Sequence, residues 1–212
     1  MTRDLLICGT RSFAEEVADL AGDVPGWRVA GFVENWERDR VGDRIDGLPI
    51  CWVDELAGRR DVWAVCALVT TRRSLFTAQV ESLDIPFATL VHPTARISSR
   101  STAAEGTIVS AGVVVGARTS IGRHAILNRG VLVGHHTSIG DHVSLLPGAN
   151  VAGNVRVDDA AFVGMGATVL DGLTVGARSV VAAGSVVTRD VPDGVQVRGV
   201  PARVVGETPQ GR

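Results

Sequence analysis

The sequence predicts a mainly β chain, in which a parallel β-helix built from six-residue repeats follows a small α/β domain. Two observations predict the β-helix. From Val91 to Val187, every sixth residue forms a series of 17 positions, and 16 of them are Val, Ile or Leu. This period fits neither a helix, which repeats every 3.6 residues, nor a flat strand, which repeats every two. A third observation, the alternation of strand and helix patterns before residue 90, predicts the α/β domain.

The composition is that of an ordinary globular chain. Its 212 residues are 45% hydrophobic and carry a formal net charge of −2, which argues against nucleic acid or an anionic membrane as the main partner. The longest apolar run spans residues 62–69 and is too short for a membrane helix, which needs about 18 residues. The N-terminus lacks the features of a signal peptide. Cys8, Cys51 and Cys66 show no C-x-x-C spacing, so we expect a reducing cytoplasm without disulfides or structural zinc.

The expected elements of the first domain, residues 1–90, follow in order. Residues 5–9 read as a buried strand and residues 13–21 as a helix with one apolar face. Residues 27–35 and 61–69 read as further strands, residues 74–83 as a second helix, and residues 87–91 as the lead into the second domain, residues 91–212. In a parallel α/β sheet, ligands bind beyond the carboxyl ends of the strands.

The loop after the first strand is the candidate ligand loop of this domain. It reads Gly9-Thr10-Arg11-Ser12-Phe13, which is not G-x-G-x-x-G and so does not support a dinucleotide site. We expect Ser12 to cap the following helix, whose free N–H groups could hold a phosphate. A purely structural loop is equally consistent with these residues.

Each six-residue repeat of the second domain predicts one short strand and one turn, and three repeats close a triangular coil. We expect the repeated aliphatic residue to point inward and about 100 residues to give five to six coils before Asp193 ends the series. The residue that follows the aliphatic one is often glycine, and we expect these glycines to provide the positive φ of sharp corners. They are Gly116, Gly122, Gly134, Gly140, Gly164 and Gly176.

The histidines are the first candidates for chemistry, and all of them lie in or at the start of the β-helix: His92, His124, His135, His136 and His142. His124 and His142 are one coil apart and should stack, whereas His135 and His136 follow a corner glycine and should point to opposite sides. A three-histidine zinc site needs histidines at matched positions of successive coils. His135 and His136 do not join the column of the other two, so we expect no metal, and a surface role remains the alternative for each histidine.

Several motifs are those of one known family: Gly31-Phe32-Val33-Glu34-Asn35, Asp46-Gly47-Leu48-Pro49-Ile50, Val91-His92-Pro93, the stretch from Asn128 to His135, Pro147-Gly148-Ala149 and Gly199-Val200-Pro201-Ala202. With them, the whole chain resembles the sialic acid O-acetyltransferase and UDP-4-amino-sugar N-acetyltransferase family of left-handed β-helix acyltransferases. The family implies a Rossmann-like nucleotide-sugar-binding domain and a homotrimer of left-handed β-helices with active sites between subunits. The left hand is an exception to the usual right-handed crossover.

The resemblance also implies roles for single residues. His135 matches the general base that takes a proton from the acceptor, with Asn128 and His136 beside it as further catalytic positions. Residues matching the acetyl-CoA contacts are Ser144, Gly164, Met165, Gly166, Ala182, Ala183, Gly184 and Arg189. Residues matching the contacts to a nucleotide-linked amino sugar are Gly9, Thr10, Arg11, Ser12, Phe13, Glu34 and Asn35.

Two departures from the family pattern keep alternatives open. The acidic residue that often follows the base is His136 here, so the orienting carboxylate is missing or is replaced by a backbone carbonyl or by Asp141. A second family histidine is Ser144 here. N-acetylation of a nucleotide-linked amino sugar is the leading hypothesis. The alternatives are O-acetylation of a sialic-acid-like sugar or specialised metabolite, and a catalytically inactive scaffold that binds nucleotide sugars.

Overall fold

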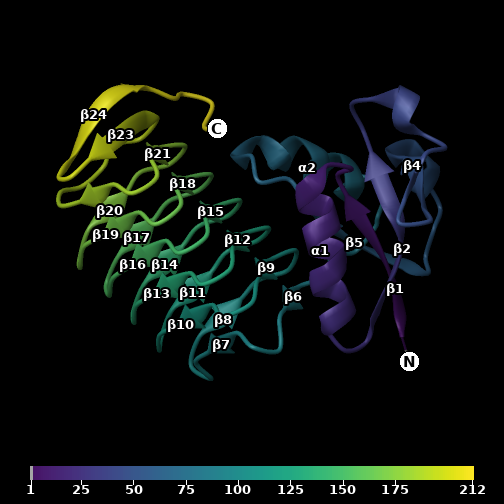
Figure 1. Cartoon of the computed structure of the whole chain (residues 1–212), viewed down its shortest axis with the longest axis horizontal. Coiled ribbons are helices and arrows are strands. Elements are labelled where there is room, and N and C mark those ends of the chain that lie inside the picture. Colours follow the sequence, from purple (N-terminus) through teal and green to yellow (C-terminus); the bar gives the residue numbers. More distant parts are fainter. Residues whose placement is uncertain (1) are drawn as a thin grey trace.

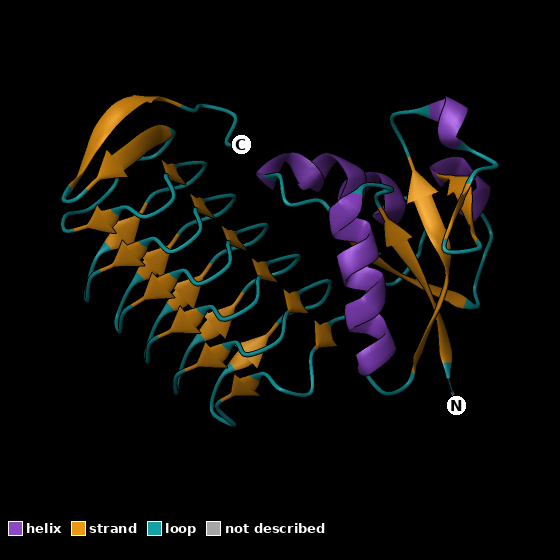
Figure 2. Cartoon of the chain, viewed as in Figure 1, coloured by secondary structure: helices purple, strands orange, loops and turns teal. Residues whose placement is uncertain are grey.

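A computed structural model describes residues 2–212 of the chain. It places an N-terminal α/β part beside a β-helix whose coils progress away from it (Figure 1). Figure 2 shows the contrast between the two parts, since the α-helices lie in the N-terminal part and the β-helix consists of short strands and turns. Within residues 2–212, no helix is long and apolar enough to cross a membrane.

The N-terminal part is built on a five-stranded sheet with the order β3-β4-β2-β1-β5. Its strands are β1 (Arg3–Cys8), β2 (Trp27–Glu34), β3 (Arg44–Ile45), β4 (Leu48–Trp52) and β5 (Val62–Cys66). All neighbours pair in parallel except β3 and β4, which form a small antiparallel hairpin. The strand expected over residues 61–69 is shorter in the structure, where β5 ends at Cys66.

Helix α1 (Ser12–Asp23) packs on this sheet because its buried residues lie on one face: Ala14, Val17, Leu20 and Ala21. Ser12 is the first residue of α1 rather than its cap. Arg11 occupies the N-cap position and makes no side-chain capping bond, so the expected Ser12 cap is wrong. Helix α2 (Ser74–Glu81) begins directly after a 3₁₀ turn, Thr71–Arg73. Two further 3₁₀ turns, Arg38–Arg40 and Val53–Leu56, flank β3 and β4.

The β-helix has three parallel sheets, as the six-residue period predicts. The first sheet contains β6 (Leu90–Val91), β9 (Ile108–Val109), β12 (Ile126–Leu127), β15 (Ser144–Leu145), β18 (Phe162–Val163), β21 (Val180–Val181), β23 (Val195–Gly199) and the antiparallel β24 (Ala202–Glu207). The second contains β7 (Arg96–Ile97), β10 (Val114–Val115), β13 (Leu132–Val133), β16 (Asn150–Val151), β19 (Thr168–Val169) and β22 (Val186–Val187). The third contains β8 (Thr102–Ala103), β11 (Ser120–Ile121), β14 (Ser138–Ile139), β17 (Arg156–Val157) and β20 (Thr174–Val175).

Three columns of turns connect these sheets. We call the turns from the first sheet to the second the first corner, those from the second to the third the second corner, and those from the third back to the first the third corner. The second residue of each strand is the repeated aliphatic one, and most of these side chains form one continuous buried core. Burial of this apolar column is the main stabilising term of the β-helix.

The corner glycines have a different role from the expected one. Positive φ values fall two residues after the aliphatic position's neighbour in most turns, at Gly130, Gly148 and Gly166, and also at non-glycine residues such as His136. Gly134 has no positive φ, but a Cβ there would lie 2.4 Å from the backbone nitrogen of Gly153 in the next coil. The glycine that follows the aliphatic residue therefore allows close approach of successive coils rather than a left-handed turn.

The N-terminal part packs on the outer face of the first sheet. Leu90, Ile108 and Ile126 point outward from that sheet and share a buried cluster with Leu5 and Ile7 of β1. Farther along the same face, Arg73 is 1% exposed and donates hydrogen bonds to Ser144 Oγ at 2.8 Å and to the Val143 carbonyl at 2.7 Å. The two parts thus share an apolar contact and a buried polar contact.

The end of the chain folds back over the β-helix. Strands β23 and β24 form a hairpin that the six-residue pattern did not predict, and the segment after β24 turns back toward α2 (Figure 1). The Thr71 amide donates to the Arg212 carbonyl at 2.8 Å, and the Arg212 amide donates to Thr71 Oγ1 at 3.0 Å. This segment therefore connects the far end of the β-helix to the N-terminal part.

Candidate active site

His135 and His136 occupy one turn of the second corner, and both are exposed. Their Nδ1 atoms are 3.1 Å apart and their rings meet edge to face with centroids 5.2 Å apart. The expectation that they point to opposite sides is wrong, because His136 has φ +56° and the backbone turns sharply there instead of staying extended. Two imidazoles in contact can share a proton, which suits acid–base chemistry.

The His135 ring extends over the next coil. A Cβ on Gly153 would lie 2.7 Å from His135 Cε1 and 2.9 Å from Nε2, so glycine is required there for the ring to take this position. Asp141, which the sequence offers as a substitute carboxylate, lies at the third corner and accepts a hydrogen bond from the Arg123 amide at 2.7 Å. It therefore caps the backbone of another turn and does not lie beside His135.

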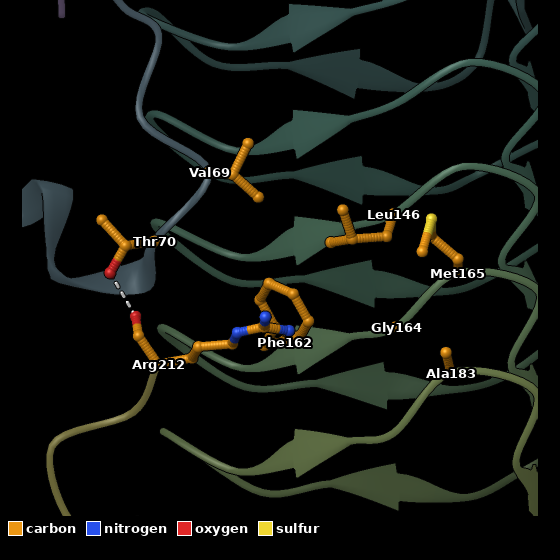
Figure 3. Close-up of a pocket in the computed structure, with 8 residues that line it drawn as sticks. All are labelled: Val69, Thr70, Leu146, Phe162, Gly164, Met165, Ala183 and Arg212. Atoms are coloured by element: carbon orange, nitrogen blue, oxygen red, sulfur yellow. Dashed lines mark hydrogen bonds between the residues drawn. The ribbon is translucent and has the colours of Figure 1, made fainter. Parts of the chain in front are cut away.

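Most of the residues expected to contact acetyl-CoA lie at the first corner. Gly164, Met165 and Ala183 line a pocket of about 340 Å³, and Gly166, Ala182 and Gly184 belong to the same turns. The pocket is also lined by Val69 and Thr70 from the segment after β5. Figure 3 shows the Arg212 guanidinium lying across the Phe162 ring, with Leu146 and Met165 on successive turns beyond it. The guanidinium carbon is 4.5 Å from the ring centroid, so a cation forms one wall of the pocket.

Three other predicted residues lie apart from this pocket. Ser144 is completely buried, and its hydroxyl accepts from Arg73 and donates to the Val69 carbonyl at 2.8 Å, so no part of it is free for a cofactor. Arg189 lies after β22, where it lines a separate pocket with Arg203. Asn128 is 3% exposed at the first corner, where its side-chain oxygen accepts from the Arg129 amide at 2.7 Å. Asn128 and His135 thus lie on different corners of one chain.

The loops at the carboxyl ends of β1 and β2 form a second hollow. A pocket of about 170 Å³ is lined by five predicted residues, Gly9, Thr10, Arg11, Glu34 and Asn35, and also by Trp36, Glu37, Leu68 and Phe76. A pocket of about 300 Å³ continues from it through Asn35 and Trp36 to Arg72 and Leu75. Ser12 and Phe13 do not line either pocket.

Glu34 organises the floor of this hollow. One carboxylate oxygen accepts from the Asn35 amide at 2.9 Å and from the Trp36 amide at 2.8 Å, and the other accepts from the Thr10 hydroxyl. Burial alone would raise the pKa of Glu34, but these hydrogen bonds outweigh burial and lower its pKa. Arg11 forms an ion pair with Glu37 at the rim. The hydrogen bonds of the Glu34 carboxylate are therefore made within the loop, whereas the Trp36 side chain is 87% exposed and open to a ligand.

His124 and His142 stack as their spacing predicts, with ring centroids 5.0 Å apart. They lie beneath α2, where His142 Nε2 is 3.1 Å from the Thr77 hydroxyl and His124 Nε2 is 3.2 Å from Glu81. Burial and the neighbouring His124 lower the pKa of His142 to about 4. Across residues 2–212, no group of three or more His, Cys, Asp or Glu side chains is arranged to hold a metal ion.

Sequence reasoning missed the pocket residues that come from outside the quoted motifs. Trp36 follows the carboxyl end of β2 and Leu68 follows that of β5, so the general rule for ligand sites in α/β sheets could have identified these two, whereas Phe76 lies on α2. Arg212 lies 48 residues beyond Gly164 in the sequence, and no local pattern indicates that the two line one pocket.

Comparison with known proteins places this geometry in context. No family model matches the sequence, and neither does any curated protein. Among solved structures, a variant of perosamine N-acetyltransferase from Caulobacter crescentus, with one histidine replaced by asparagine and with CoA and GDP-perosamine bound, is 31% identical. The match covers 96% of this chain and 97% of that one, with a TM-score of 0.90.

A second match is the acetyltransferase domain of PglB from Neisseria gonorrhoeae in complex with acetyl coenzyme A. It is 27% identical, with a TM-score of 0.87 and coverage of 97% of this chain and 100% of that one. WeeI from Acinetobacter baumannii, at 24% identity and a TM-score of 0.86 over 96% of this chain and all of its own, shares the fold.

The three-sheet β-helix and its likeness to these N-acetyltransferases define an acyltransferase of the six-residue-repeat class. More narrowly, the chain belongs to the family of hexapeptide-repeat sugar acetyltransferases that includes the perosamine enzyme.

Proposed function

We propose that this protein transfers the acetyl group of acetyl-CoA to the amino group of a nucleotide-linked amino sugar, with His135 as the general base. The observation that carries the proposal is the exposed His135 imidazole, held at a corner of a β-helix that matches GDP-perosamine N-acetyltransferase over nearly its whole length. Two structures of that enzyme have one histidine replaced, by asparagine or by alanine, and both contain CoA and GDP-perosamine.

In this reaction the neutral amine attacks the carbonyl carbon of the thioester, and His135 accepts the proton that the nitrogen loses. A backbone N–H of the coil is the simplest donor to the oxyanion of the tetrahedral intermediate. The C–S bond then breaks, and the sulfur of CoA receives the proton from His135. An amide and the free thiol of CoA are the products.

The two substrates approach from different parts of the chain. The pantetheine arm of CoA lies along the first corner, past Gly164, Met165 and Ala183, where Arg212 offers a positive charge. The nucleotide sugar enters the hollow at the carboxyl ends of β1 and β2, where Trp36 offers an aromatic surface and Arg72 a cation. We assign the sugar nucleotide to residues 1–90, read as a Rossmann-like domain, and acyl transfer to residues 91–212, read as a left-handed β-helix.

A homotrimer completes the site in this proposal. His135 lies at the second corner and the CoA pocket at the first, so the second sheet separates them within one chain. The outer face of that sheet carries Val114 and Leu132, which are 42% and 44% exposed. Apolar residues at this exposure suit contact with another subunit. We place the enzyme in the cytoplasm, where acetyl-CoA is available and where its free cysteines stay reduced.

The test is thiol release from acetyl-CoA with UDP-, dTDP- and GDP-linked amino sugars and with free sialic acid as acceptors. We expect turnover with one nucleotide-linked amino sugar and a loss of about 100-fold or more in kcat for His135→Ala. His92→Ala is the matched control, since His92 contacts Asp23 and Thr94 away from either pocket. Turnover with sialic acid alone would replace the proposal by an O-acetyltransferase. Nucleotide binding without thiol release would replace it by an inactive scaffold.

A further inference from the structure

The 18-residue period of the coil places Ala117, His135, Gly153 and Asp171 of the second corner in one column, with Ser99 before them and Arg189 after them. Hydrogen bonds between coils fix this register, because the Asn154 amide donates to the His135 carbonyl at 2.8 Å and the Gly172 amide donates to the Gly153 carbonyl at 3.0 Å. Neighbouring strands are about 4.8 Å apart, so one coil separates the backbones of His135 and Asp171. The residue in that intervening coil is glycine.

Gly153 leaves a gap that both side chains approach. The point where a Cβ of Gly153 would lie is 2.9 Å from His135 Nε2 and 3.1 Å from Asp171 Oδ1. The ring nitrogen and the carboxylate oxygen therefore face each other across a single glycine. Within residues 2–212 no direct hydrogen bond joins the two groups, and both side chains are exposed, so a rotation of either one can bring them together.

A neutral neighbour also contacts the carboxylate. Asn154 Nδ2 donates to Asp171 Oδ1 at 3.3 Å, and this is the oxygen that lies over Gly153.

The remaining charged or titratable groups around the column are few. His136 contacts Nδ1 of His135. Arg118 lies one coil before His136, at the matching position of its turn. In the turn one coil after that of Asp171, the side chains of Arg189 and Asp190 are exposed. Asp190 accepts a hydrogen bond from the Thr174 amide at 2.7 Å.

We propose that Asp171 is a positioning residue that accepts a hydrogen bond from Nε2–H of His135 across the gap at Gly153, which leaves Nδ1 to accept the amine proton in place of its contact with His136, and that Asp171 stabilises the imidazolium so formed. This inference rests on the proposed function, in which His135 is the base. A carboxylate that accepts a hydrogen bond from an imidazole fixes the ring orientation and favours its charged form. The residue directly after His135 is a histidine, which cannot supply this negative charge, whereas Asp171 can.

The experiment compares kcat and the pH dependence of kcat/KM in the wild-type enzyme, Asp171→Asn, Asp171→Glu and the control Asp19→Asn. We expect Asp171→Asn to lower kcat about tenfold, with the KM for acetyl-CoA changed less than twofold. We also expect the acid limb of its profile to move about 0.5 pH unit lower, because a lost negative charge disfavours the protonated ring. Asp171→Glu should restore the wild-type limb. Asp19, exposed on α1, should change neither quantity.

The outcomes separate this inference from the proposed function. If His135→Ala keeps full activity, the base assignment itself is wrong. If His135→Ala is inactive but Asp171→Asn keeps both the wild-type kcat and the wild-type acid limb, Asp171 has no part in the reaction. Loss of activity in Asp171→Asn with an unmoved limb would make its role merely structural and overturn the inference. Gly153→Ala gives an independent test, since its Cβ displaces the His135 ring, and it should lower kcat while the KM for acetyl-CoA stays within twofold.

Discussion

Arg73 shows, at the scale of a single residue, how the two parts of the chain are joined. Its guanidinium is buried without a carboxylate partner in the described chain, and its charge is met by the carbonyls of His124, Val143 and Thr70 at 2.7–2.9 Å. Burial lowers the pKa of Arg73 to about 10, which still leaves the group charged at neutral pH. A buried guanidinium with several acceptors is costly to remove, because those acceptors then lose their partners.

We predict that Arg73→Ala lowers the free energy of unfolding by about 3–5 kcal/mol. Arg73→Lys keeps the charge but cannot reach carbonyls on both sides at once, so it should cost about 2 kcal/mol. Urea denaturation followed by circular dichroism measures both effects, and Arg72→Ala, one residue away and exposed, should change stability by less than about 0.5 kcal/mol. An Arg73→Ala variant as stable as Arg72→Ala would show that the buried contact contributes nothing.

The single residues also show where sequence reasoning succeeds and where it stops. The stack of His124 on His142 followed from one coil of spacing, and the same arithmetic applied twice would have placed Asp171 in the column of His135, two coils further on. The burial of Arg73 could not be inferred, because Thr70-Thr71-Arg72-Arg73 reads as an ordinary polar turn. Its partners belong to two coils more than 50 residues away, and only the tertiary fold brings them together.

At the scale of elements, the β-helix was predictable and the N-terminal sheet was predictable only in outline. A repeat of six fixes each strand to within a residue, so the aliphatic series coincides with the buried core. In the N-terminal part, the apolar run continues past Cys66, but the strand ends there, and the Val69 carbonyl beyond it accepts from Ser144 Oγ of the β-helix. The β23–β24 hairpin follows the last repeat, where the period that would have located it has ended.

The two kinds of corner glycine give a prediction at this scale. Gly134→Ala places a Cβ 2.4 Å from the Gly153 nitrogen, and rigid backbone on both sides cannot yield, so we expect a loss of more than about 3 kcal/mol or failure to fold. Gly166→Ala meets open space and has only a φ of +62° to accommodate, so about 1–2 kcal/mol should be lost. Thermal unfolding of the two variants measures the difference. Equal losses in the two variants would contradict these roles, in which Gly134 allows the coils to approach closely and Gly166 provides the positive φ of the turn.

At the scale of the whole molecule, the separation of His135 from the CoA pocket determines what one chain can do alone. The proposed base, His135, lies at the second corner and the proposed CoA pocket at the first, on either side of the second sheet. If a neighbouring subunit supplies the missing half, each active site contains His135 from one chain and the Gly164–Ala183 corner from another. A heterologous interface of this kind closes into a ring of identical sites.

This arrangement predicts that two inactive variants restore activity when mixed. His135→Ala removes the base, and Ala183→Trp fills the corner pocket, so each variant alone should be at least about 100-fold less active than the wild type. In trimers formed at random from equal amounts, about a quarter of the sites combine an intact histidine with an intact pocket. We therefore expect about a quarter of the wild-type thiol release after the variants are unfolded together and refolded. Each variant refolded alone is the control, and size-exclusion chromatography with light scattering verifies that the mixtures are trimers. Because a site within one chain would carry one of the two defects in every subunit, activity no higher than that of the controls would assign both halves to the same chain.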